Sequence, residues 1–322
     1  MRRVAIVLAA LLLASPAVSA DTAETMTTLR TQALNLINRD RLKHRLPPVA
    51  LDVHASQVGD AYCLQQIRNG TTGHYTTDGL SPYMRYSFAG GNDAVAENAA
   101  AWSASYVFSE RALYEMIRRS QEAMMAEKPP DDGHRRAILD PHATHVGIGL
   151  AWRGGEFRFV QEFLRRHVEW TRPLPRLANL TDVVSTAGRG VGDAKVEAIT
   201  VHHEPFPGPL APRAASAIES YALPASRKEY LPRLRSDYTR REDGTLHIVR
   251  REYTGGHRGD FFLGEKGEFS FTVPFPDGPG IYTVVVWVRR PGAATPVAAS
   301  NVSIRVEGAL QSPARSSAGG HQ

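Results

Sequence analysis

The chain has 322 residues, of which 42% are hydrophobic and 22% are charged, and its formal net charge at neutral pH is +5. This composition is typical of a globular protein with one large or two medium-sized domains. The basic excess is too small, and too mixed with acidic residues, to indicate a nucleic-acid-binding groove. The single cysteine, Cys63, excludes an intrachain disulfide.

The first twenty residues, 1–20, have the composition of a secretory signal peptide. Two arginines precede the apolar run 4–14, and Val18 and Ala20 stand at the −3 and −1 positions of a signal-peptidase site. The apolar run is too short to span a bilayer, and no later stretch is long and apolar enough to do so. We therefore expect cleavage between Ala20 and Asp21, and a protein that is secreted or periplasmic and not integral to the membrane.

Residues 21–170 carry helical patterns first and strand patterns last. Asp52 and Ser109 are suited to cap the helices that follow them. Cys63 lies among apolar residues of the second helix and is expected to be a packed thiol, not a reactive one. The patterns predict helices over 24–45, over 52–69 and between Ser109 and "EKPPDDG", then a β-hairpin of "HVGIGLAW" and "EFRFVQEFL" around the glycines at 154–155.

The sequence changes in character after Trp170, where helical periodicity largely disappears. Segments such as "EFSFTVPFP", "GIYTVVVWVRR" and "ASNVSIRVE" are β-rich and are separated by turn residues, as in a β-sandwich. We therefore expect one domain over 21–170, a smaller all-β, sandwich-like domain over 171–307, and a disordered tail over 308–322, where Ser, Ala and Gly predominate.

Three segments of the first domain contain residues that could build a site. His74 lies in "NGTTGHYTTDGLSPYMR", His134 lies in "GHRRAILDPHATHVGIGLAW", and Glu97 interrupts the apolar "AVAENAAAW". An acid in so apolar a run is costly to bury unless a cation or hydrogen-bond donors meet it. Two histidines with carboxylates can hold a zinc-like ion, or act as a base with its orienting acid. From composition and spacing alone, the simpler interpretation of three unrelated surface residues is favoured.

The remaining histidines receive structural interpretations. His142 follows a proline in a turn and is expected to face solvent, and His145 is expected to make structural hydrogen bonds. His202, His203 and Glu204 are adjacent, but neighbours on an extended strand point to opposite faces and rarely chelate one ion together. The chain lacks HExxH, GxSxG and Walker-type glycine motifs, which argues against the common motif-marked hydrolases and nucleotide enzymes.

The order of the motifs resembles that of the CAP superfamily, which includes cysteine-rich secretory proteins, wasp antigen 5, plant pathogenesis-related proteins and bacterial secreted (SCP-domain) members. The segments "LNLINRDRLKHRLPPVALD", "GHYTTDGLSPYMRY", "AENAAAW", "GHRRAILDPHATHVGIGLAW" and "RFVQEF" follow in the family's order over about residues 27–165. The resemblance implies an α+β fold: a CAP-type α-β-α sandwich with a central cleft lined by two histidines and two glutamates. The chain departs from the family in lacking framework cysteines and in having "MMAEKPPDDGHRR" where many members have a tryptophan-containing segment.

Carried onto this sequence, the resemblance implies that His74, His134 and Glu97 line the cleft. For the second glutamate, Glu115 lies at about the family's distance from the second histidine, whereas Glu122 lies closer to it. We prefer Glu115, although both face away from the apolar side of their helix. His74 and His134 are then the candidate ligands of a zinc ion, and no catalytic nucleophile is tied by motif to either histidine.

Three functions are open for such a protein. The first is a secreted binding module for a small molecule, lipid, glycan or envelope protein, a breadth that the resemblance implies. The second is a structural or recognition protein in which the two histidines and two glutamates form only a polar network. The third, a metal-assisted hydrolase with a neutral histidine as base or ligand, is least favoured because two histidines chelate more weakly than three. We expect no nucleic-acid partner.

Overall fold

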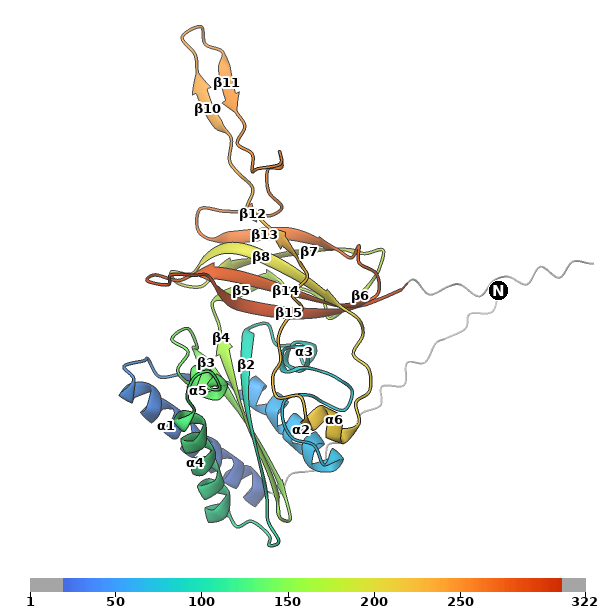
Figure 1. Ribbon diagram of the computed structural model, residues 1–322. Helices are drawn as coiled ribbons and strands as arrows, with labels where there is room; N and C mark the ends of the chain where they lie inside the picture. Colours follow the sequence, from blue (N-terminus) through green and yellow to red (C-terminus); the bar gives the residue numbers. More distant parts are fainter. Residues whose placement is uncertain (1–19, 309–322) are drawn as a thin grey trace, which may run out of the picture.

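The computed structural model describes residues 20–308. The signal peptide and the tail predicted for 1–20 and 308–322 lie outside these residues, apart from Ala20 and Gly308. Mixed helix and strand content in several sheets gives the α+β class expected from the sequence, with a helix-and-sheet part followed by a β-sandwich (Figure 1). No helix within the described range is both long and apolar enough to cross a membrane.

The N-terminal part, residues 20–165, is a four-stranded sheet with helices on both faces. The strand order is β1-β3-β4-β2, so β2 is an edge strand, and β3 and β4 form the predicted hairpin. Helices α1 and α4 cover one face, and α2 covers the other (Figure 1). The elements are α1 (Ala20–Lys43), β1 (Ala50–Leu51), α2 (Val53–Asn69), α3 (Pro82–Phe88), β2 (Ala94–Ser103), α4 (Glu110–Ala126), α5 (Gly133–Ile138), β3 (His145–Arg153) and β4 (Glu156–Arg165).

The expected starts of α2 and α4 and the expected end of α2 are confirmed, whereas α1 spans Ala20–Lys43 and not 24–45. The Asp52 side chain accepts a hydrogen bond from the Ala55 amide at 2.7 Å and starts α2, and Gly70 ends that helix in the left-handed conformation, with φ 63°. Ser109 caps α4 by accepting a hydrogen bond from the Ala112 amide at 3.3 Å. These contacts satisfy backbone groups that a helix end leaves without partners.

Apolar layers on both faces hold the sheet between its helices. The layer between the sheet and helices α1 and α4 includes Leu29, Ile37, Leu113 and Ile117, which are at most 1% exposed. Burying a side chain of this size contributes about 1.5–3 kcal/mol to folding. Cys63 lies in the layer under α2 and is buried, and burial raises the pKa of its thiol, so it is the packed thiol that the sequence predicts.

Helix α2 approaches the sheet closely at a pair of glycines. A Cβ on Gly149 of β3 would overlap the backbone of Gly59 of α2, and a Cβ on Gly59 would lie 2.8 Å from the Gly149 Cα. We expect Gly149→Ala to lower the free energy of unfolding by about 1–3 kcal/mol, because the two backbones must separate. Urea denaturation measures the loss. Gly208→Ala, where a Cβ would meet nothing within 4 Å, should change it by less than about 0.5 kcal/mol; equal losses in both variants would contradict this packing.

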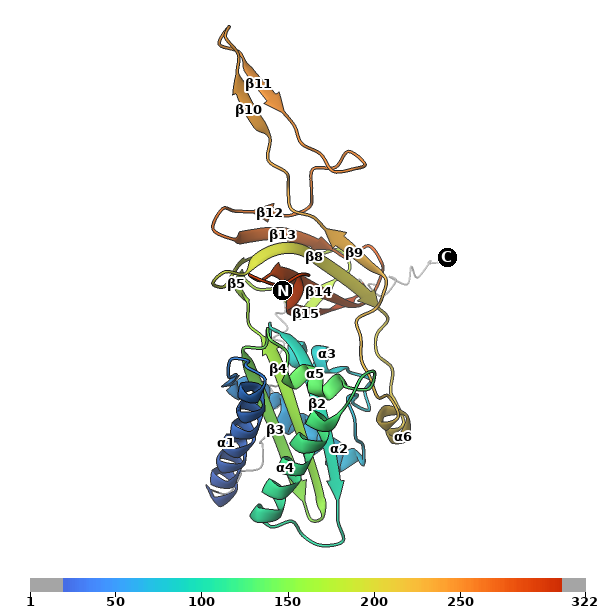
Figure 2. The same cartoon turned by 60° about the vertical axis from the view of Figure 1, so that its left-hand side comes forward.

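The C-terminal sandwich, residues 168–307, consists of two sheets around one apolar core rich in valine and phenylalanine. The strand orders are β12-β13-β7-β5 and β6-β15-β14-β8-β9. Two further strands, β10 (Asp237–Arg240) and β11 (Leu246–Val249), form a separate hairpin that projects from it (Figures 1 and 2). The sandwich strands are β5 (Val168–Arg172), β6 (Leu177–Asn179), β7 (Val183–Gly190), β8 (Lys195–Glu204), β9 (Arg227–Tyr230), β12 (Phe262–Leu263), β13 (Glu268–Pro274), β14 (Gly280–Arg289) and β15 (Val297–Glu307).

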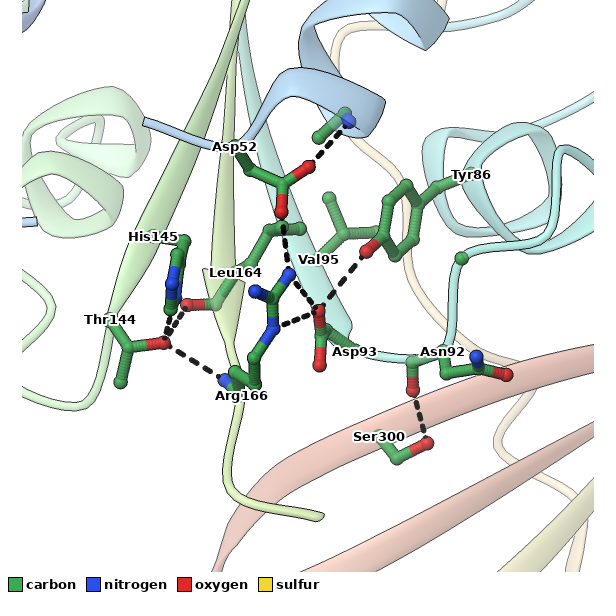
Figure 3. A network of polar contacts seen from close by, with 12 residues as sticks. Asp52, Tyr86, Asn92, Asp93, Val95, Thr144, His145, Leu164, Arg166 and Ser300 are labelled. Atoms are coloured by element: carbon green, nitrogen blue, oxygen red, sulfur yellow. Dashed lines mark hydrogen bonds and ion pairs between the residues drawn. The ribbon is translucent and has the colours of Figure 1, made fainter. Parts of the chain in front are cut away.

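Arg166, the residue directly after β4, connects several N-terminal elements beside the sandwich. The Arg166 guanidinium donates to Asp52 at 2.6 Å and to Asp93 at 3.0 Å, and Tyr86 donates to Asp93 at 3.2 Å (Figure 3). The Ser300 hydroxyl of β15 donates to the carbonyl of Asn92, the residue before Asp93 (Figure 3). The start of α2, α3, the start of β2 and β15 are therefore held at one junction.

A long connection between β8 and β9, residues 205–226, returns from the sandwich to the N-terminal part; we call it the strap. It contains α6 (Pro212–Ser216) and runs beside α2 and α3 (Figures 1 and 2). The Leu210 amide donates to the Thr77 carbonyl at 2.7 Å, and the Thr72 amide donates to the Ser216 hydroxyl at 3.1 Å. The sandwich thereby adds residues to the surroundings of the loop that follows α2.

Candidate functional site

A cleft of about 980 Å³ lies beside the edge strand β2. His74 reaches it from the loop between α2 and α3, and His134 reaches it from the first turn of α5; their ring centroids are 6.3 Å apart. Glu97 and Asn98, whose side chains point to opposite faces of β2, contact the His74 ring and the His134 carbonyl respectively. The two histidines thus approach the edge strand from its two faces. The structure brings together His74, Glu97 and His134.

Each imidazole is held at Nδ1 by a carboxylate. Nδ1 of His74 lies 2.9 Å from Oε1 of Glu97, and Nδ1 of His134 lies 2.5 Å from Oε1 of Glu127. The other Glu127 oxygen accepts from the His134 amide at 3.0 Å. A carboxylate at Nδ1 favours the tautomer with its proton there, which leaves Nε2 free to accept a hydrogen bond or bind an ion. Neither Nε2 has a hydrogen-bond partner among residues 20–308.

The second carboxylate of the cleft is Glu127, which corrects the sequence-based preference for Glu115. Glu115 lies on the solvent side of α4, where Arg118 and Arg119 donate to it at 2.7 and 2.8 Å. These hydrogen bonds lower the pKa of Glu115 to about 2. Glu122, the alternative, pairs with Arg118 on the same side. Glu127 stands directly after α4, and the turn through "KPPDDG" returns the chain so that its carboxylate meets the second histidine.

A buried arginine supports the first histidine pair. The Arg85 guanidinium lies 3.5 Å above the Tyr62 ring, donates to the His74 carbonyl at 2.6 Å and forms an ion pair with Glu97. The Arg85 and Glu97 side chains are 7% and 0% exposed, so each charge depends on the other for compensation. Burial alone would lower the pKa of Arg85, but the Glu97 carboxylate outweighs burial and raises it. Arg85 therefore stays cationic beneath the cleft.

A second buried carboxyl group, Glu162, lies directly opposite Glu97 in the pairing of β2 with β4. Both of its side-chain oxygens are buried without a hydrogen-bond partner among the described residues. Burial, and then the negative charge of Glu97, raises the pKa of Glu162 well above its usual range. This favours the neutral form of Glu162, so Arg85 and Glu97 form the one compensated charge pair among these three groups.

We expect the stability advantage of Glu162→Gln over the wild type to grow as the pH rises above about 4.3, the ordinary glutamate pKa. In that range the unfolded wild type releases the Glu162 proton while the folded state retains it, so the free energy of unfolding of the wild type falls with rising pH. Glutamine is neutral in both states and lacks this dependence. Urea denaturation of both proteins between about pH 4.5 and about pH 7.5 measures the difference. A difference that stays constant over this range would contradict the raised pKa.

The strap forms one wall of the cleft through Ser216 and residues 218–221. The Tyr221 ring packs edge-on against His74, with centroids 4.9 Å apart. Its hydroxyl accepts a hydrogen bond from the Glu97 amide and donates to the Glu97 carbonyl at 3.3 Å. Burial, and then the charge of Glu97, raises the pKa of Tyr221, so the hydroxyl remains a donor. The cleft is therefore shared between the N-terminal part and the strap.

The other histidines have structural roles. His145 contacts the Thr144 hydroxyl at 2.9 Å, as expected (Figure 3). His142 is half-buried, which corrects the expectation that it faces solvent, and burial lowers its pKa. His202 is buried and bonds to a strap carbonyl at 2.7 Å, whereas His203 packs on a tyrosine ring of β14. His202 and His203 thus point to different partners, in agreement with the strand argument.

The cleft offers at most two nitrogen ligands to a divalent ion, one from His74 and one from His134. Both Nε2 atoms are available, but Glu97 and Glu127 are engaged at the Nδ1 atoms. Within residues 20–308, no group of three or more His, Cys, Asp or Glu side chains is arranged to hold a metal. An ion would therefore be held by His74 and His134, with water in the remaining positions, unlike a closed structural zinc site.

The N-terminal part of the chain is similar to a known protein family. Residues 34–163 match the model of the CAP family, described as the cysteine-rich secretory protein family. An extracellular protein containing an SCP domain from Bacillus anthracis str. Ames is 18% identical, with a TM-score of 0.35; the match covers 47% of this chain and 45% of that chain, so less than half of that protein is spanned. An outer surface protein from Borrelia burgdorferi is 20% identical, with a TM-score of 0.34, over 45% of this chain and 95% of that chain.

The comparison with curated proteins gives no match. The family match includes His74, Glu97, Glu127 and His134, and it agrees with the motif order over about residues 27–165. Over residues 34–163, the chain contains a CAP domain.

Proposed function

We propose that the chain is an exported binding protein whose CAP cleft takes an extracellular or envelope ligand, and that His74 and His134 hold a divalent, zinc-like ion there. The observation that carries the proposal is the engagement of each imidazole by a carboxylate at Nδ1. Metal-ligating histidines usually donate their other ring N–H to such a partner, which fixes the ring and raises the basicity of Nε2. The proposal of export rests on the signal-like composition of residues 1–20.

The chain's own residues prepare the two nitrogens. Glu97 orients His74, and Arg85 compensates the charge of Glu97 from below. Glu127 orients His134 and also binds its amide, so ring and backbone are held by one carboxylate. When bound, the ion would supply positive charge and open coordination positions for an oxygen or nitrogen of the ligand.

The alternative function is surface recognition, with the same residues acting only as a polar network. In that alternative, the same hydrogen bonds hold the two rings without an ion. Zinc affinity distinguishes the two functions, because only the ion-binding cleft is expected to bind zinc saturably.

Zinc titration of the full chain by calorimetry tests the proposal. We expect saturable binding that weakens as the pH falls from about 7.5 to about 5.5, because protons compete with the ion for neutral imidazole. Glu127→Gln should weaken binding about 10–100-fold, since it removes the carboxylate partner of a ligating histidine. Glu115→Gln, on the solvent side of α4, is the matched control and should bind zinc as the wild type does. Equal affinities of the Glu127→Gln variant and the wild type would contradict the assigned role of Glu127.

A further inference from the structure

On the outer edge of β2, only some of the backbone N–H and C=O groups have hydrogen-bond partners within the described chain. In an antiparallel strand, the N–H and C=O of one residue point to the same side, and successive residues alternate. Those of Val95, Glu97, Ala99 and Ala101 point away from β4. Side chains from β15 and the strap satisfy the Val95 amide and the Glu97 amide and carbonyl. The C-terminal sandwich and the strap thus already bind this edge at two successive positions.

The next two positions along the edge are open. No hydrogen bond from residues 20–308 reaches the outward amide and carbonyl of Ala99 or Ala101. Ala99 lines the cleft, and Ala101 is exposed. Proteins usually protect such an edge with lysine, proline, a bulge or a covering segment. Here the edge presents alanines, whose small side chains leave room for an incoming backbone.

The charges around the open edge favour a basic occupant. Asp131 and Glu219 line the cleft from the "KPPDDG" turn and from the strap, and both are exposed and without an ion-pair partner among the described residues. The two arginines of the lining, Arg136 and Arg165, are each paired with an aspartate, at 3.1 and 2.6 Å. The unpaired charges of the cleft wall are therefore negative.

We propose that the cleft takes an extended, lysine- or arginine-bearing peptide, which pairs with Ala99 and Ala101 as an additional strand of the sheet. The peptide backbone would bond to the two open positions, and its basic side chains would reach Asp131 and Glu219. The peptide would pair no further toward the start of β2, because Tyr221 already binds the Glu97 amide and Asn301 of β15 already binds the Val95 amide. This inference rests on the proposed binding function of the cleft, but not on a bound ion.

The test uses the full chain without metal and the blocked peptide acetyl-Ser-Lys-Val-Lys-Ser-amide, followed by amide NMR. We expect saturable binding that shifts the Ala99 and Ala101 amide resonances. The same peptide with N-methyl groups on alternate amides cannot form the ladder, and we expect it to bind at least 10-fold more weakly. The peptide with glutamate in place of lysine should also bind at least 10-fold more weakly. No saturable binding of the parent peptide, or equal affinity of the N-methylated one, would overturn the proposal.

A matched pair of variants tests the strand edge from the protein side. Ala99→Pro removes the outward N–H but no bond to β4, whereas Ala99→Ser keeps the N–H. We expect the proline variant to lose at least 10-fold in peptide affinity and the serine variant to bind normally. Full peptide binding by a folded proline variant would overturn the proposal. A wild-type dimer in sedimentation that Ala99→Pro abolishes would also overturn it, because the occupant of the edge would then be a second copy of the chain. Zinc calorimetry of the same proteins is independent: zinc binding without peptide binding refutes this inference alone.

Discussion

Replacing Arg85 with methionine should lower the free energy of unfolding by about 3–5 kcal/mol. The substitution keeps an unbranched apolar side chain against the Tyr62 ring but leaves the Glu97 carboxylate buried without its cation. Removing one partner of a buried ion pair is costlier than removing both, because the remaining charge keeps its desolvation penalty. Arg85→Met combined with Glu97→Gln should therefore recover part of the loss. Urea denaturation at neutral pH measures all three proteins.

Arg118→Met on α4 is the matched control for Arg85→Met. Arg118 also pairs with glutamates, but its side chain is 36% exposed, so solvent screens the pairs. We expect a loss below about 1 kcal/mol. A loss of that same small size for Arg85→Met would contradict the role of Arg85 as the compensating charge beneath the cleft.

His74→Ala combined with His134→Ala should abolish saturable zinc binding, because no nitrogen ligand of the proposed site remains. The metal-free variant should still fold, since Arg85 continues to compensate Glu97. His202→Ala combined with His203→Ala removes the same number of imidazoles from the sandwich and should leave zinc affinity unchanged. Calorimetry on both double variants gives the comparison. Equal zinc binding by the wild type and the His74/His134 double variant would contradict the metal site and favour the polar network.

Local signals in the sequence predict much of the N-terminal domain. Asp52 and Ser109 start helices because their side-chain oxygens bind amides within three residues, a contact that needs no tertiary structure. The strand patterns of β3 and β4 follow from their apolar runs and the glycine turn between them. The prediction that His74, Glu97 and His134 form one site rests on the resemblance of the motif order to the CAP superfamily. Their spacing alone would not have predicted it.

The rest of the site depends on contacts between distant segments. Glu127 was not predicted because it lies outside the helical pattern, in a turn that reverses the chain. The available signal was its position a few residues before "GH". Arg85 and Glu162 carry no sequence mark of burial, since charged residues are buried only where a partner or a raised pKa permits it. Tyr221 belongs to the strap of the sandwich, so only the assembled fold brings it to His74.

Anomalous diffraction from a zinc-soaked crystal, recorded at the zinc absorption edge, shows directly whether an ion binds between the two histidines. We expect a peak in the cleft about 2.0–2.1 Å from Nε2 of both His74 and His134, with Glu97 and Glu127 still bonded to the Nδ1 atoms. Glu127→Gln crystals soaked in parallel should show the same peak at lower occupancy. A fully occupied zinc peak elsewhere, with none between the two histidines, would contradict the proposed site.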